Sequence, residues 1–185
     1  MSSLFRSFVK NPNKVHYDGE DPDEGIIYLF RKSFFVNLGW MLISTTMIII
    51  PSIISWFYNP ELLASAGIPL NLVKVCLIFW YLCIFGYILH NGLSWFFNIY
   101  IVTNKKIVDI DFRGLTYKNI SEAPIRNIED VTSNISGFLG TIFNYGSVEI
   151  QTSAEKREFE FESVSNPSKI RDIIADLVEE EKNGR

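Results

Sequence analysis

Few residues of this chain have the type and spacing that catalysis requires. His90 precedes Ser94 by four residues, an arrangement that faintly resembles a serine nucleophile with its base. Such a site needs a water-filled cavity lined by protein, which the two apolar segments of this chain can hardly enclose. We therefore assign no catalytic residue and expect the protein not to be an enzyme. We interpret His90 instead as the hydrogen-bonding partner of Asn37, an ordinary polar pair between two apolar helices.

Metal, cofactor and nucleic-acid chemistry have little support. The two histidines, His16 and His90, lie on opposite sides of the first apolar segment, whereas zinc needs about four close ligands. Cys76 and Cys83 are too far apart on one straight helix to form a disulfide. No glycine-rich phosphate loop opens a helix. Residues 105–185 carry 11 Lys and Arg against 15 Asp and Glu, so this part is acidic and argues against nucleic-acid binding. We expect no metal and no cofactor.

Five basic side chains form a second set of candidates: Arg31, Lys32, Lys105, Lys106 and Arg113. One interpretation is contact with anionic lipid headgroups, since each cation near a charged leaflet contributes about 1 kcal/mol. The other is that four of them flank membrane-spanning segments and set the topology. The acidic composition around them favours the second interpretation.

Two apolar segments must position these residues. No charged residue occurs between Lys32 and Glu61, and none between Lys74 and Lys105. Because a spanning helix needs about 20 mostly apolar residues, we predict a transmembrane hairpin over 34–96, with helices at 34–57 and 72–94. Basic residues on both outer flanks place the N- and C-termini in the cytoplasm. We therefore expect a multi-pass protein of the cell (plasma) membrane.

The rest of the chain is patterned for a β domain over 97–185, preceded by a cytoplasmic, solvated lead-in at 1–33. Within the lead-in, the apolar run 26–30 is either a strand edge or an interfacial segment. Alternating residues predict strands at 107–112, 115–125, 128–136, 148–152 and 158–161, with hairpin turns at 113–114 and 155–157. We predict a loop over 137–146. Asn166 as N-cap and Pro167 open a helix that continues to residue 182, with an apolar stripe along one face.

Several phrases of the sequence together resemble a known family. They are EGIIYLFRKSF (24–34), YIVTNKKIVDIDFRGL (100–115), APIRNIEDV (123–131), GFLGTIFNYGSVEIQT (137–152) and FEFESVSNP (159–167). The chain resembles bacterial pleckstrin-homology domain proteins of the YdbS-like kind, with two N-terminal transmembrane helices. The resemblance covers nearly everything after residue 24. It implies an α+β domain, namely a partly open antiparallel β-barrel of six or seven strands capped by a C-terminal helix, and it brings no active site.

The leading functional hypothesis is a membrane protein that displays this domain as a non-catalytic interaction or assembly module. Tethering makes a weak contact with a membrane or cytoplasmic protein effectively intramolecular, and an open barrel edge can accept a peptide strand. Two alternatives remain. The domain senses anionic lipid headgroups, or the chain is an accessory subunit of a transporter or channel whose Asn37 and His90 line a pathway in a homo-oligomer.

Overall fold

The computed structural model describes residues 7–12, 16–17, 19–56, 67, 69–113, 117–153 and 158–184. The chain divides into two compact units. Residues 1–36 and 94–185 form the first, which we call the sheet domain. Residues 37–93 form the second, which we call the helical pair. Each unit is described by itself.

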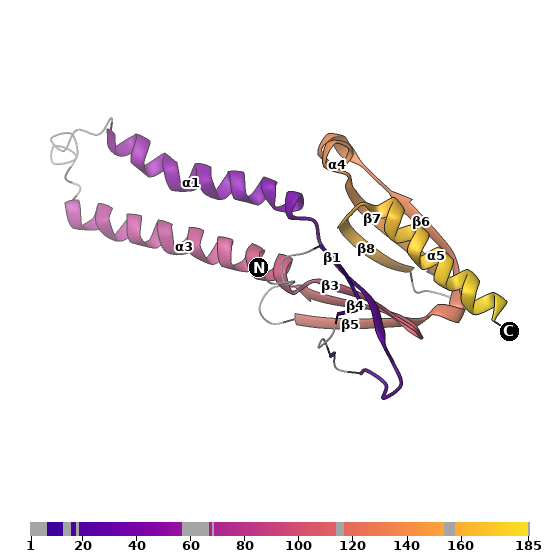
Figure 1. The fold of residues 1–185 in the computed structure, drawn as a ribbon. Coiled ribbons are helices and arrows are strands. Elements are labelled where there is room, and N and C mark those ends of the chain that lie inside the picture. The colour runs from indigo at the N-terminus through magenta and orange to yellow at the C-terminus, as the bar shows by residue number, and fades with distance from the viewer. Residues whose placement is uncertain are drawn as a thin grey trace. The chain divides into compact units, whose positions relative to one another are not determined.

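The helical pair consists of α1 (Leu38–Trp56) and most of α3 (Leu70–Phe97), which run antiparallel (Figure 1). The Trp80 indole N–H donates a hydrogen bond to the Met47 carbonyl, at 3.1 Å, and so links the two helices. Most of their large apolar side chains are exposed. By length and composition, Phe34–Ile54 and Leu70–Phe97 are each able to cross a membrane. The two expected helices are therefore present, although Phe57, the expected end of the first, lies outside the described residues.

The sheet domain contains two antiparallel sheets. The first has the strand order β1 (Phe8–Lys10), β2 (Ile26–Arg31), β3 (Ile99–Thr103), β4 (Lys106–Arg113) and β5 (Tyr117–Pro124). A short 3-10 turn, η3 (Ile125–Asn127), leads to the second sheet of β6 (Ile128–Asn134), β7 (Tyr145–Thr152) and β8 (Glu158–Ser165). A single bridge joins Lys32 to Val164, but the two sheets do not close into a barrel.

The main core lies between the two sheets and the C-terminal helix α5 (Pro167–Asn183), which packs along β6 and β7 (Figure 1). Ile170, Ile174 and Val178 are buried on one face of α5, which confirms the predicted apolar stripe. Asn166 occupies the N-cap position, but its side chain makes no capping hydrogen bond and its backbone is left-handed. The predicted helix is therefore present without the predicted side-chain cap.

A second, smaller core covers the other face of the five-stranded sheet. It contains Ile101, Val108 and Ile110, packed with the half-buried Tyr17, Ile26, Ile99, Phe112 and Ile120. The alternation in β4 identifies an apolar face correctly, but that face belongs to this smaller core. Ile107, on the opposite face of β4, belongs to the main core.

Two segments and the number of strands differ from the sequence-based expectations. The lead-in at 1–33 contributes β1 and β2, which pair with each other. β2 also pairs with β3, so the run 26–30 is a strand of the sheet. The expected loop over 137–146 contains the helix α4 (Gly137–Phe143) and the start of β7. Eight strands are described instead of six or seven, because the N-terminal segment adds to the sheet. The turn residues 114 and 155–157 lie outside the described residues.

Candidate anion-binding site

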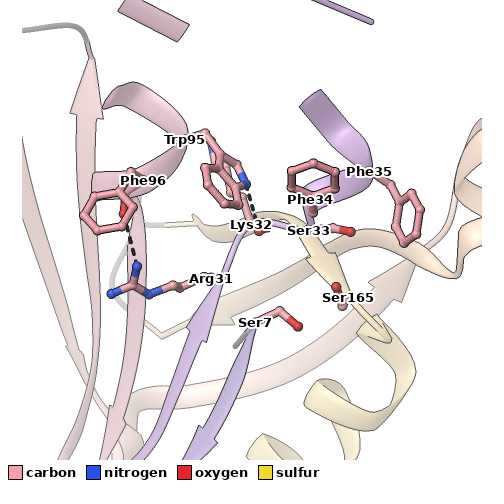
Figure 2. Close-up of a pocket in the computed structure, with 9 residues that line it drawn as sticks. All are labelled: Ser7, Arg31, Lys32, Ser33, Phe34, Phe35, Trp95, Phe96 and Ser165. Carbon is pink, nitrogen blue, oxygen red and sulfur yellow. Dashed lines mark hydrogen bonds between the residues drawn. The ribbon is translucent and has the colours of Figure 1, made fainter. Parts of the chain in front are cut away.

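The sheet domain holds a pocket of about 340 Å³ beside the end of β2. Figure 2 shows the residues that line it: Ser7, Arg31, Lys32, Ser33, Phe34, Phe35, Trp95, Phe96 and Ser165. Small-molecule sites are commonly of this kind, largely apolar with a few polar groups that fix the ligand. Here the polar groups are one guanidinium, one ammonium and three hydroxyls.

Arg31 supplies the charge of the pocket. It ends β2 opposite Ile99 of β3, so the sheet register fixes its position. One terminal nitrogen, Nη1, lies 3.5 Å from the Phe96 carbonyl oxygen, and the guanidinium carbon lies 5.2 Å from the centre of the Phe96 ring (Figure 2). Its Nε is buried and has no hydrogen-bond partner in the described part of the chain. Burial lowers the pKa of Arg31, although a guanidinium remains protonated.

Ser33 is the second polar group without a partner. Its hydroxyl oxygen is buried and makes no hydrogen bond, whereas its backbone N–H donates to the Ser163 carbonyl at 2.7 Å. The backbone is therefore anchored to β8, while the buried hydroxyl has no partner among the described residues. Two buried polar groups left unpaired in one pocket are unusual, because each costs free energy unless something binds it.

Aromatic side chains and one ion pair frame these groups. The rings of Phe34 and Trp95 meet edge to face, with centres 5.9 Å apart. The Trp95 indole N–H donates to the Lys32 carbonyl at 3.1 Å. The Lys32 ammonium lies 2.9 Å from a carboxylate oxygen of Glu162, so its charge is compensated. Arg31 has no such carboxylate partner among the described residues and is the uncompensated cation of the pocket.

This arrangement is suited to holding a small anion. A guanidinium donates charge-assisted hydrogen bonds to phosphate or carboxylate oxygens, and a serine hydroxyl adds a further donor. The pocket residues include no histidine, cysteine or carboxylate that would act as a base or nucleophile. Within the described part of the chain, no group of three or more His, Cys, Asp or Glu side chains is placed to hold a metal ion.

The five basic residues named from the sequence do not share one surface. Arg31 pairs with Ile99 at one end of the five-stranded sheet, and Lys106 pairs with Pro124 at the opposite end of β4 from Arg113. Lys106 and Arg113 are seven positions apart along β4, about 23 Å at 3.3 Å per residue. Lys105 is exposed beside Lys106. The Arg113 side chain lies outside the described residues.

Lys106 is engaged in a polar network of its own. Its ammonium lies 2.8 Å from Glu122 and 3.4 Å from the buried carboxylate of Glu24, and it donates to the Gly19 carbonyl at 2.9 Å. Glu24 also accepts hydrogen bonds from the Tyr17 hydroxyl and the Asp21 amide. Burial alone would raise the pKa of Glu24, but the hydroxyl of Thr103, the two hydrogen bonds just named and the charge of Lys106 lower it. The network fastens Tyr17, Gly19 and Glu24 to the sheet, so Lys106 is not available to a ligand.

Asn37 and His90 belong to the helical pair. The Asn37 side chain is buried, and its carbonyl oxygen accepts a hydrogen bond from the Trp40 indole at 2.9 Å. His90 is exposed on α3. Their pairing with each other remains a prediction from the sequence.

Sequence reasoning identified Arg31 and Lys32 but missed Ser33, Trp95 and Phe96. The aromatic residues are more than 60 positions from Arg31, and only the β2–β3 pairing brings them together. A tryptophan and two phenylalanines directly after an apolar segment were the one indication of a site in the sequence.

One family model matches more than half of this chain. The family model described as "Bacterial PH domain" matches residues 61–178. Among solved structures, a protein of the DUF1696 family with a pleckstrin-homology domain, from Shewanella loihica PV-4, is similar at 19% identity. The match covers 44% of this chain and 70% of that one, with a TM-score of 0.35. No curated protein matches.

Proposed function

Because the chain belongs to the bacterial PH domain family, we propose that it is a membrane-anchored, non-catalytic protein whose sheet domain binds the phosphate of an anionic lipid headgroup. One observation carries the proposal. Arg31 is a half-buried cation without a carboxylate partner among the described residues, and its unpaired Nε shares a pocket with the unpaired hydroxyl of Ser33. A phosphate group supplies a negative charge and acceptor oxygens for the Arg31 guanidinium.

The position of the pocket in the chain favours a lipid as the source of that phosphate. Phe34 and Phe35 begin the first candidate spanning segment, and Trp95 and Phe96 lie at the end of the second. If both segments cross the bilayer, these residues lie at the level of the headgroups, where tryptophan is enriched. With both termini in the cytoplasm, the pocket faces the leaflet that carries anionic lipids.

Lipid binding to the purified full-length chain tests the proposal. We would titrate the protein in neutral detergent with phosphatidylglycerol, with phosphatidylcholine and with inorganic phosphate, and count bound molecules by native mass spectrometry. Arg31→Gln should weaken phosphatidylglycerol binding by about tenfold or more, since a charged hydrogen bond contributes about 1.5–3 kcal/mol. Lys105→Gln removes the same charge from an exposed site at the other end of the sheet and should change little.

Three results would decide between sources and mechanisms. Equal loss in both variants would mean that net charge, and not the pocket, governs binding. Equal affinity for phosphatidylcholine would remove the preference for anionic lipid. Binding of inorganic phosphate as tight as that of phosphatidylglycerol would identify a free anion as the ligand.

A second function is favoured by the edge of the larger sheet. β5 is the outermost strand of its sheet among the described residues, and its Asn119 side chain is exposed. A free strand edge can bind an extended peptide through main-chain hydrogen bonds. A photo-crosslinking residue at position 119 should then capture a protein partner or a second copy in native membranes, whereas one at the exposed Asp176 of α5 should not.

A further inference from the structure

The exposed large apolar side chains of the sheet domain fall in two places within its described part. Phe34, Phe35 and Phe97 lie at the ends of the candidate spanning segments. The others gather on and just before α4: Ile135, Phe138, Leu139 and Ile142. Apolar side chains exposed together on a small helix indicate that something apolar covers them.

The exposed side chains of α4 share one face. Phe138 is 79% exposed, Ile142 56% and Leu139 45%. Positions 138 and 142 are four residues apart and 139 and 142 are three apart, so all three project from the same side of the helix.

The remaining residues of α4 fix the helix to the domain. Gly140 is buried, and a Cβ there would lie 3.0 Å from the Tyr145 carbonyl oxygen. Asn144 ends the helix in a left-handed conformation, and its N–H donates to the Gly140 carbonyl. The Phe143 ring stacks on Phe35 with ring centres 4.1 Å apart. The exposed face is therefore held in place by packing and is not a loose tip.

The contact between Phe143 and Phe35 indicates what covers the face. Phe35 is the second residue of the first candidate spanning segment, so α4 packs directly against the point where the chain leaves the sheet domain for that segment. The segment itself is also uncharged, because no Asp, Glu, Lys or Arg occurs between Asp130 and Glu149; Glu160 and Glu162 of β8 share a pocket with Ser136, just before the helix. A protein surface that meets the acyl boundary of a bilayer needs this combination of exposed apolar side chains and missing charge.

From this geometry we infer that α4 inserts Phe138, Leu139 and Ile142 into the bilayer surface and so docks the sheet domain on the membrane. The inference rests on the proposed membrane anchoring, but it uses none of the residues of the Arg31 pocket except Phe35. With no basic residue in the segment, apolar burial drives the docking, and it should depend little on salt.

A fluorescent probe on α4 tests the inference in the full-length chain. Cys76→Ser and Cys83→Ser remove the two free cysteines, and Phe138→Cys then gives a single site for a nitrobenzoxadiazole label. Asp176→Cys, on the exposed face of α5, is the matched control. The labelled proteins are reconstituted in nanodiscs, one copy per disc, with lipids brominated on their acyl chains. We expect about twofold or greater quenching of the probe at 138, with little at 176.

The opposite pattern would overturn the inference. If iodide in the buffer quenches the probe at 138 as strongly as the probe at 176, and bromolipids do not, then α4 faces water. If the probe at 138 is shielded only in discs that hold two copies, the covering partner is a second copy of this chain.

Retention of the protein in the discs during gel filtration reports on anchoring separately. A protein that stays in the discs with a water-exposed probe overturns the role of α4 alone. A protein that leaves the discs overturns the membrane anchoring as well. Loss of phosphatidylglycerol binding in Arg31→Gln, with quenching at 138 retained, leaves the inference intact.

Discussion

Replacing Arg31 with Met separates a ligand-binding role from a structural one. A buried cation whose hydrogen bonds are completed only by a bound anion destabilises the unliganded domain. A cation whose contacts within the protein are complete stabilises the domain. Methionine keeps the length and apolar stem of the side chain but has no charge and no donor. The two roles therefore predict opposite changes in stability when no anion is present.

The contacts of Arg31 set the expected size of the effect. A buried, unpaired donor such as its Nε costs about 1–3 kcal/mol. The contact of the guanidinium with the Phe96 ring, at 5.2 Å from the ring centre, stabilises the domain by about 0.5–1 kcal/mol. The hydrogen bond to the Phe96 carbonyl, at 3.5 Å, is at the limit of useful length and adds little. We expect Arg31→Met to stabilise the anion-free domain by about 1 kcal/mol, or to raise its Tm by about 3 °C.

Thermal unfolding of the full-length chain in neutral detergent, followed by circular dichroism, measures this change. A saturating short-chain phosphatidylglycerol should then remove or reverse this order. Ligand at about 100 times the wild-type Kd stabilises the wild-type domain by about 2.7 kcal/mol, and it stabilises a variant that binds tenfold more weakly by about 1.4 kcal/mol. Lys105→Met provides the control for charge alone. A variant that unfolds several degrees below the wild type without anion would refute the reasoning and make Arg31 a structural residue.

Three other substitutions test the fold around the site. In Gly146→Ala the new Cβ would clash with the Asn134 carbonyl oxygen. We expect the free energy of unfolding to fall by about 2–3 kcal/mol and amide exchange in β7 to become roughly 30–150-fold faster. Gly25→Ala is the control, because open space surrounds its Cβ, and it should leave exchange unchanged. Glu24→Gln should cost about 1–2 kcal/mol of unfolding free energy at neutral pH, measured by urea unfolding. Because the pKa of Glu24 is lowered in the folded state, the ionised carboxylate stabilises the fold at neutral pH, and this contribution disappears as the carboxyl is protonated. The variant should therefore lose less stability than the wild type on acidification below about pH 4. Burial raises the pKa of Tyr100, so the wild-type domain should lose stability as the pH rises above about 10, and Tyr100→Phe should lose less stability over that range. At neutral pH, urea unfolding should show the variant to be less stable by about 1–3 kcal/mol, because it lacks the hydrogen bonds with the Glu162 backbone.

Local pattern predicted most of the fold. The apolar stripe of α5 and the alternation in β4 and β8 are properties of neighbouring residues, and the structure contains those elements. The helix α4 was missed because its seven residues show no polar face and include two glycines. Its position depends on Phe35, more than 100 residues away, which a local pattern does not reveal. β1 was missed for a similar reason, since a three-residue strand is defined by its pairing with β2.

The site was predictable only in part. Arg31 stood out as a basic residue before an apolar segment, but its chemistry depends on which basic residues have partners. Lys32 is paired with Glu162 and Lys106 with Glu24 and Glu122, and neither pairing is visible in composition. The net charge of −4 argued against lipid binding because it counts compensated and uncompensated charges alike. The β3–β4 register then separates the remaining basic residues along the sheet.

A single guanidinium is a weak ligand site for a soluble protein. A contribution of about 1.5–3 kcal/mol corresponds to a dissociation constant far above 1 mM, which would leave a freely diffusing domain unbound. Under the proposed anchoring, attachment to two spanning helices changes this balance, because the headgroups would then surround the pocket at high local concentration and the entropy of association would already be lost. If α4 also rests in the bilayer surface, the orientation of the pocket is fixed as well. One uncompensated cation is then sufficient to select anionic lipids, and a more basic surface is unnecessary.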